Sequence, residues 1–113
     1  MSPIIVRNSS IPKFASIFIS VYAITLFPFI FIRDEGDERV IRHEMIHFWQ
    51  YIETLIIGFL IIYSFDFIKG LIKYKNVQKA YERIRFEQEA YENDYHRYYK
   101  LNRKRWAWRK YKV

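Results

Sequence analysis

His43, Glu44 and His47 form the sequence H-E-M-I-H, and these are the residues whose types and spacing could do chemistry. If the segment is helical, side chains four residues apart lie on one face, so both imidazoles can bind the same metal ion. Glu44 lies about 100° around the helix from His43, close enough to the metal's open position to accept a proton from bound water. We therefore predict a metal site with His43 and His47 as ligands and Glu44 as the catalytic base.

A third ligand would have to be a histidine or a carboxylate, because the chain contains no cysteine. His96 is the one other histidine, and it stands among charged and aromatic residues that are typical of a surface. Better candidates are Glu87 and Glu89 in residues 86–93, F-E-Q-E-A-Y-E-N. Each also has a simpler interpretation, because glutamates interleaved with arginines form ordinary ion pairs on helix surfaces. Two histidines four residues apart can likewise be hydrogen-bonded polar side chains between packed helices.

The sequence H-E-M-I-H-F-W-Q followed by F-E-Q-E-A-Y-E-N resembles small HExxH proteins of bacteria and phages, within the zincin metallopeptidases that use a glutamate ligand. These two short motifs carry the resemblance, which covers about residues 22–93. The resemblance implies Zn²⁺ as the cofactor and the glutamate immediately before alanine, Glu89, as the third ligand, with Glu87 as the alternative. It also implies that Asn93 or Asp94 braces one of the ligand histidines.

The same resemblance implies peptide hydrolysis, in which Glu44 passes the proton it accepts to the leaving amine. In zincins an edge strand binds the extended peptide, and the corresponding strand would fall within residues 23–32. At 113 residues, however, the chain is shorter than typical secreted zincins and shows no obvious second lobe. The alternative is a non-catalytic structural or accessory subunit of a larger membrane or virion assembly that retains a zincin-like core.

The H-E-M-I-H segment has the signals of a helix that begins at Glu38 and continues to at least Glu53. Asp37 can cap its first turn, and the acidic Glu38 suits the positive end of the helix dipole. An apolar stripe at helical spacing should face a core, and it comprises Ile41, Met45, Phe48 and Ile52.

The positions of the two motifs require a bend between them. A straight helix over residues 47–70 would rise about 34 Å, whereas a return helix over residues 76–89 would descend only about 20 Å. A simple hairpin would therefore leave the later glutamates far from the histidines. We predict a break at Gly58, with residues 59–74 forming a separate helix that crosses the pair.

Residues 14–32 contain no charged residue and admit three interpretations. As a secretory signal, Lys13 precedes an apolar core, but no small-residue cleavage site follows. As a membrane-spanning helix the segment is just long enough, although Pro28 would kink it. Its many β-branched and aromatic residues favour one or two strands.

These elements predict a mainly α fold, with α+β possible. The HExxH helix would pack against two further helices, beside one or two short N-terminal strands or one N-terminal membrane helix. We divide the chain into an N-terminal extension (1–13), a single zincin-like domain (14–99) and a basic, aromatic tail (100–113). Residues 81–108 contain neither proline nor glycine and are predicted to be helical.

The chain has a formal net charge of +7, and the C-terminal tail is strongly basic. Because Trp and Arg or Lys together suit a membrane interface, we expect the protein to be membrane-associated and to contact anionic lipid through this tail. Nucleic acid is a less favoured partner. The residues expected at this contact are Arg103, Lys104, Arg105, Trp106, Trp108, Arg109 and Lys110.

Overall fold

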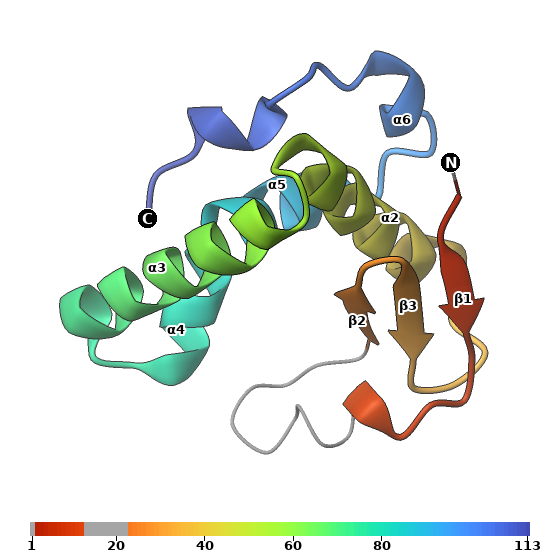
Figure 1. Cartoon of the computed structure of the whole chain (residues 1–113), viewed down its shortest axis with the longest axis horizontal. Helices are drawn as coiled ribbons and strands as arrows, with labels where there is room; N and C mark the ends of the chain where they lie inside the picture. Colours follow the sequence, from red (N-terminus) through yellow and green to blue (C-terminus); the bar gives the residue numbers. More distant parts are fainter. Residues whose placement is uncertain (1, 13–22) are drawn as a thin grey trace.

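The computed structural model describes residues 2–12 and 23–113, and shows a mainly helical fold with a small three-stranded sheet (Figure 1). The expected fold class is therefore confirmed. The part of the apolar segment that precedes residue 23 lies outside the described residues.

Residues 23–32 form a hairpin of two strands rather than helix. Strands β2 (Ala23–Leu26) and β3 (Phe29–Ile32) pair antiparallel across the Phe27–Pro28 turn, and β1 (Ile4–Val6) pairs parallel with β3. The strand order β1-β3-β2 leaves β2 at an edge of the sheet. The strand interpretation is thus confirmed for these residues. Strand β1 was not predicted, because its pairing with β3 is distant in sequence.

No single described helix is long and apolar enough to cross a membrane. Helices α2 (Glu38–Glu53) and α3 (Ile57–Tyr74) meet that criterion only as a pair, and the chain bends by 112° between them.

Helix α2 has the predicted bounds, and the Asp37 side chain caps it by accepting a hydrogen bond from the Val40 amide. Its buried face differs from the predicted stripe, because Ile52 is 41% exposed while His43 and Gln50 are buried. The helix buries these polar side chains because partners on a later helix satisfy their hydrogen bonds.

The predicted break between the two motifs is present, but it precedes the glycine. Leu55 and Ile56 both adopt positive φ angles, 56° and 67°, and these residues turn the chain between α2 and α3. Gly58 lies in the first turn of α3, where an added Cβ would stand 3.1 Å from Thr54 Cβ. Gly70 does not break α3 either; a Cβ there would lie 3.0 Å from Ala80 Cα, so the glycine permits close helix packing.

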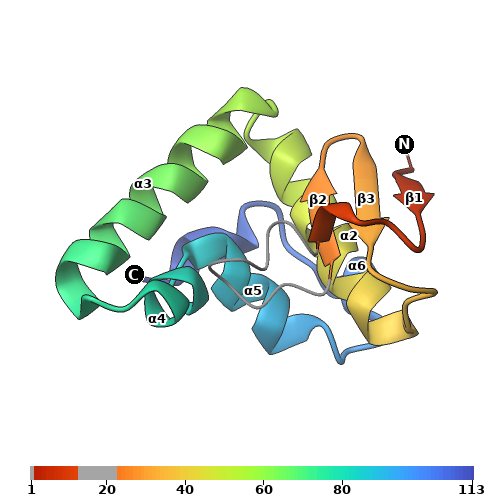
Figure 2. The ribbon, with the colours of Figure 1, turned by 90° about the horizontal axis from the view of Figure 1, so that it is seen from below.

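The single helix predicted over residues 81–108 is wrong. The Asp66 carboxylate of α3 accepts hydrogen bonds from the Arg85 backbone amide and from the Arg85 guanidinium. These bonds hold the chain at Arg85, where a new helix begins. The chain instead forms four short helical elements: α4 (Val77–Glu82), α5 (Arg85–Asn93), α6 (Tyr99–Asn102) and the 3-10 helix η1 (Ala107–Lys110). Figure 2 shows α5 lying between α2 and α4.

Aromatic rings from four elements form the core beside the site. Phe59 stacks on Tyr51 and on Phe86, with ring centroids 3.7 and 4.5 Å apart. Trp108 of η1 covers Phe86 at 4.7 Å and is only 5% exposed. Trp108 is therefore part of the core, which corrects our expectation that it contacts a membrane or an anionic partner.

Candidate metal centre

His43, Glu44 and His47 lie together on the buried face of α2. Their potential ligand atoms are all within 4.8 Å of one another, so this cluster could hold a metal ion. The helix places them there because Asp37 fixes its start and because β2 anchors its middle. Thr25 donates a hydrogen bond to the Glu44 carbonyl, and Tyr51 donates one to the Thr25 carbonyl.

Glu87 of α5 is the carboxylate that reaches both histidines. Its Oε1 lies 3.1 Å from His43 Nε2 and 2.9 Å from His47 Nε2. Its other oxygen accepts a 2.6 Å hydrogen bond from the Tyr63 hydroxyl, which fixes the orientation of the carboxylate. Two imidazole nitrogens and one carboxylate oxygen therefore face a common point, as the ligands of a His₂Glu zinc site do.

Glu89, which the resemblance implied as the ligand, points elsewhere. Its carboxylate accepts hydrogen bonds from three side chains, Gln50, Tyr99 and Arg103. The physical reason is helix periodicity, because residues two apart on α5 lie about 200° apart around its axis.

Asp94 lies against His43, as the resemblance suggested for that position or its neighbour. Asp94 Oδ2 is 3.0 Å from His43 Nδ1, and Arg39 donates a 2.7 Å hydrogen bond to the other carboxylate oxygen. Asn93 instead donates to the Glu89 carbonyl and to the Tyr111 hydroxyl. Glu87 and Asp94 lie two helical turns apart, but Glu89 and Asn93 lie one turn apart, so spacing alone does not choose between the two pairs.

Gln50 determines which nitrogen of His47 is protonated. The Gln50 amide group donates to the Phe86 carbonyl at 3.0 Å and to Glu89 at 2.9 Å. Its oxygen therefore faces His47 Nδ1, 2.8 Å away, and this nitrogen must be the donor. In neutral His47 the lone pair is then on Nε2, directed toward Glu87.

This arrangement favours positive charge between the histidines and Glu87. Burial lowers the pKa of His43, but its hydrogen bonds to the Asp94 and Glu87 carboxylates outweigh this effect and raise that pKa to about 10. The pKa of His47 is raised as well, since Glu87 outweighs the effect of burial. Burial alone would raise the pKa of Glu87, yet the two histidines hold it well below its usual value. A metal cation bound between neutral histidines and Glu87 would supply positive charge at the same place.

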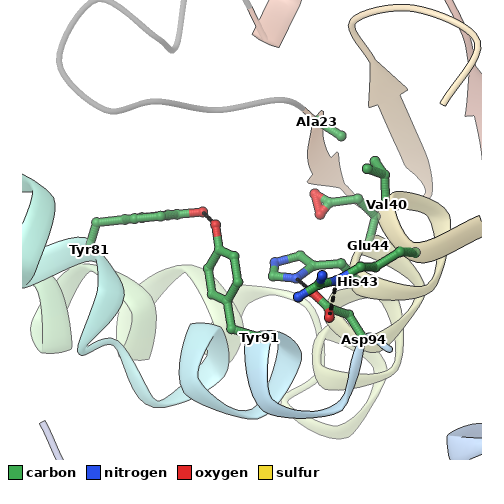
Figure 3. Close-up of a pocket in the computed structure, with 8 residues that line it drawn as sticks. Ala23, Val40, His43, Glu44, Tyr81, Tyr91 and Asp94 are labelled. Atoms are coloured by element: carbon green, nitrogen blue, oxygen red, sulfur yellow. Dashed lines mark hydrogen bonds and ion pairs between the residues drawn. The ribbon is translucent and has the colours of Figure 1, made fainter. Parts of the chain in front are cut away.

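The Glu44 carboxylate differs from that of Glu87, because no described side chain donates a hydrogen bond to it. Burial raises the pKa of Glu44, although His47 and His43 oppose this effect. Glu44 borders two cavities of about 190 and 250 Å³, and Ala23 of β2 and Tyr81 also line both. Figure 3 shows the carboxylate directed into the space between β2 and the tyrosines. A proton acceptor with a raised pKa and free oxygens suits general base catalysis.

Two tyrosines face this space and were not singled out by sequence. The hydroxyls of Tyr81 and Tyr91 lie 3.0 Å apart, and Tyr91 packs edge-on against His43 with ring centroids 4.3 Å apart (Figure 3). Burial raises the pKa of Tyr81 and raises that of Tyr91 to about 12, so both phenols stay protonated as donors. The chain contains ten tyrosines, and only packing distinguishes these two from the others.

Comparison of this chain with protein-family models, with curated proteins and with solved structures finds no match. The chemistry of the site therefore rests on its own geometry.

The His43 cluster makes the stability of the metal-free protein depend on pH. Because the pKa of His43 is raised from 6.5 to about 10 in the folded state, its contribution to stability is complete below pH 6.5. That contribution should be lost as the pH rises toward 10. We expect urea unfolding in the presence of a chelator to show a lower free energy of unfolding at pH 9.5 than at pH 6.5. An His43→Gln variant should show a smaller decrease, and an equal decrease in both proteins would contradict this prediction.

Proposed function

We propose that this protein is a zinc-dependent peptidase that uses His43, His47 and Glu87 as metal ligands and Glu44 as the base. One observation carries the proposal: a single Glu87 oxygen faces both Nε2 atoms while the two Nδ1 atoms are engaged by Asp94 and Gln50.

The residues fit zinc in number, type and orientation. Each Nδ1 has a hydrogen-bond acceptor, so each Nε2 can offer its lone pair, and such outer partners are typical of zinc-bound histidines. With both Nε2 lone pairs directed at a carboxylate oxygen, neutral histidines would leave acceptor facing acceptor. A divalent cation removes that repulsion. Two imidazole nitrogens and one carboxylate oxygen form a His₂Glu donor set, which is a common ligand set of catalytic Zn²⁺.

A bound zinc ion would act as a Lewis acid, lowering the pKa of water and polarising the substrate carbonyl. Glu44 accepts one proton from the attacking water while the water oxygen bonds to the carbonyl carbon. The carbon–nitrogen bond then breaks, and Glu44 returns the proton to the leaving amine. Tyr81 and Tyr91 line the same cavity and stay protonated; because one hydroxyl donates to the other, one O–H is left that could donate a hydrogen bond to the developing oxyanion.

The substrate would be an extended peptide bound along β2. All four residues of β2 line the larger cavity, together with Glu44 and His47. Since no described strand pairs with the outer side of β2, its backbone groups there can form main-chain hydrogen bonds with a peptide. Apolar side chains of the peptide would enter the cavity beside Phe59 and Leu60.

The alternative is a structural or accessory subunit of a larger membrane or virion assembly, without catalysis. The observation that favours it is the exposure of large apolar side chains along α3. Zinc binding with no hydrolysis of any peptide would favour this alternative.

Elemental analysis of three variants tests the ligand assignment. Wild-type protein should carry about one zinc per chain, and Glu87→Gln should weaken zinc binding by at least about a hundredfold, since a zinc site's free energy of ~10–16 kcal/mol is shared among its ligands. Glu89→Gln and Glu92→Gln, on the same helix, should retain stoichiometric zinc wherever circular dichroism shows folded protein. Loss of zinc in Glu89→Gln but not in Glu87→Gln would overturn the assignment.

A further inference from the structure

Helix α3 carries a continuous row of exposed apolar side chains. The row follows helical spacing over the whole helix, which is about 27 Å long at 1.5 Å per residue. Its members are between 50% and 74% exposed, and we call them the α3 apolar face: Ile57, Leu60, Ile61, Phe65, Ile68 and Ile72. Figure 2 shows α3 at the outer margin of the molecule, with no other described element beyond it.

This face is not used to hold the fold together. The opposite side of α3 packs against the protein through Phe59, Asp66 and Gly70, which are buried. A row of large exposed aliphatic side chains is unfavourable in water, and such patches usually mark a surface that binds another apolar phase or molecule. The α3 apolar face therefore requires an occupant.

The charged residues of α3 indicate which kind of surface the α3 apolar face binds. Asp66 is the one acidic residue of α3, and it is buried and paired with Arg85. The charged residues exposed on α3 are therefore both positive, Lys69 and Lys73, and the chain as a whole carries a net charge of +7. An apolar strip with lysines along one side is typical of a helix that lies in the interface of an anionic lipid bilayer.

A second copy of the chain fits less well. A two-fold contact through the α3 apolar face would bring Lys69 and Lys73 of one copy toward those of the other. Two molecules with a charge of +7 would also repel each other as they approach.

We propose that the α3 apolar face docks on the surface of an anionic lipid bilayer, with the helix lying along that surface. This assigns membrane contact to α3, whereas the sequence suggested the C-terminal tail. Two of the tail residues expected to make contact, Arg103 and Trp108, are in fact buried, with the Arg103 side chain only 7% exposed.

Docking in this way would also define the substrate class, a consequence that rests on the proposed peptidase function. Leu60 belongs to the α3 apolar face and also lines the 250 Å³ cavity that contains Glu44 and His47. The cavity would therefore open at the lipid–water interface. Its substrates would be peptide segments at the surface of the membrane.

Co-sedimentation with lipid vesicles tests the docking, using the full chain. Wild-type protein should bind vesicles of phosphatidylcholine and phosphatidylglycerol more tightly than vesicles of phosphatidylcholine alone. The double variant Ile61→Ser/Ile68→Ser should bind roughly a hundredfold more weakly, at roughly tenfold for each isoleucine side chain. Leu101→Ser, at an apolar residue of α6 that is 79% exposed, is the matched control and should bind like wild type.

Charge substitutions separate α3 from the tail. Lys69→Gln should weaken binding roughly fivefold, as expected for one lysine near an anionic surface, whereas Lys104→Gln/Arg105→Gln should have a smaller effect. The proposal would be overturned if the tail variant lost binding while the isoleucine variant kept it. It would equally be overturned if wild type bound no vesicles and sedimented as a dimer that the isoleucine variant dissociated. Because Glu87→Gln should bind vesicles normally, failure of docking and failure of the metal site are distinguishable.

Discussion

Replacing Glu44 with glutamine should lower peptide hydrolysis by roughly 10²–10⁴-fold, the usual effect of removing a general base. Glutamine has nearly the same shape but cannot accept the proton of the attacking water. The Glu44 carboxylate has no described hydrogen-bond partner, so the substitution breaks no described hydrogen bond. Hydrolysis of a casein or quenched-peptide substrate by zinc-loaded protein is the measurement.

Zinc content serves as the control for this experiment, because Glu44→Gln should keep about one zinc per chain. Glu92→Gln, an exposed glutamate of α5, should retain full activity. If Glu44→Gln hydrolysed peptides at the wild-type rate, Glu44 would not be the base and any activity would have another origin.

Replacing Arg103 with alanine should destabilise the fold by about 3–5 kcal/mol, the range measured when one partner of a buried ion pair is removed. Arg103 forms a bidentate pair with Glu53, with both N–O distances 2.9 Å, and donates to Glu89 at 2.6 and 3.0 Å. Burial opposes the charge on Arg103, but the two carboxylates raise its pKa further above the usual value. Without the guanidinium, both carboxylates would remain buried without a counterion.

Thermal or urea unfolding measures this effect. Lys104→Ala provides the matched control, because Lys104 is exposed and makes no ion pair within the described part of the chain; it should change stability by less than about 0.5 kcal/mol. Equal stability of the two variants would show that the Arg103 network contributes nothing to folding.

The local elements near H-E-M-I-H could be predicted because their signals are local. Asp37 as a cap and the start of α2 at Glu38 follow from a short-range hydrogen bond that the residue types themselves supply. The bend before α3 was also predictable, since the lengths of the two helical segments left no other way to bring the motifs together. Its exact place was not, because Leu55 and Ile56 rarely adopt left-handed conformations.

The division of roles between Glu87 and Glu89 depended on the tertiary structure. Both are buried glutamates on one short helix, and sequence patterns do not report which face of α5 meets α2. The packing turns Glu87 toward the histidines and turns Glu89 toward Gln50 and Arg103. Residues of similar type two positions apart therefore have different roles.

By itself, the sequence determined that two histidines and a glutamate would share one helix, because a spacing of four residues matches the helical repeat. It also determined that only histidine and carboxylate groups could complete a metal site. Tertiary structure alone decided that Glu87 reaches both histidines, that the Trp108 and Arg103 side chains lie inside the fold, and that the apolar side of α3 faces outward. The physical reason is that these facts depend on contacts between segments far apart in the chain, which no local periodicity encodes.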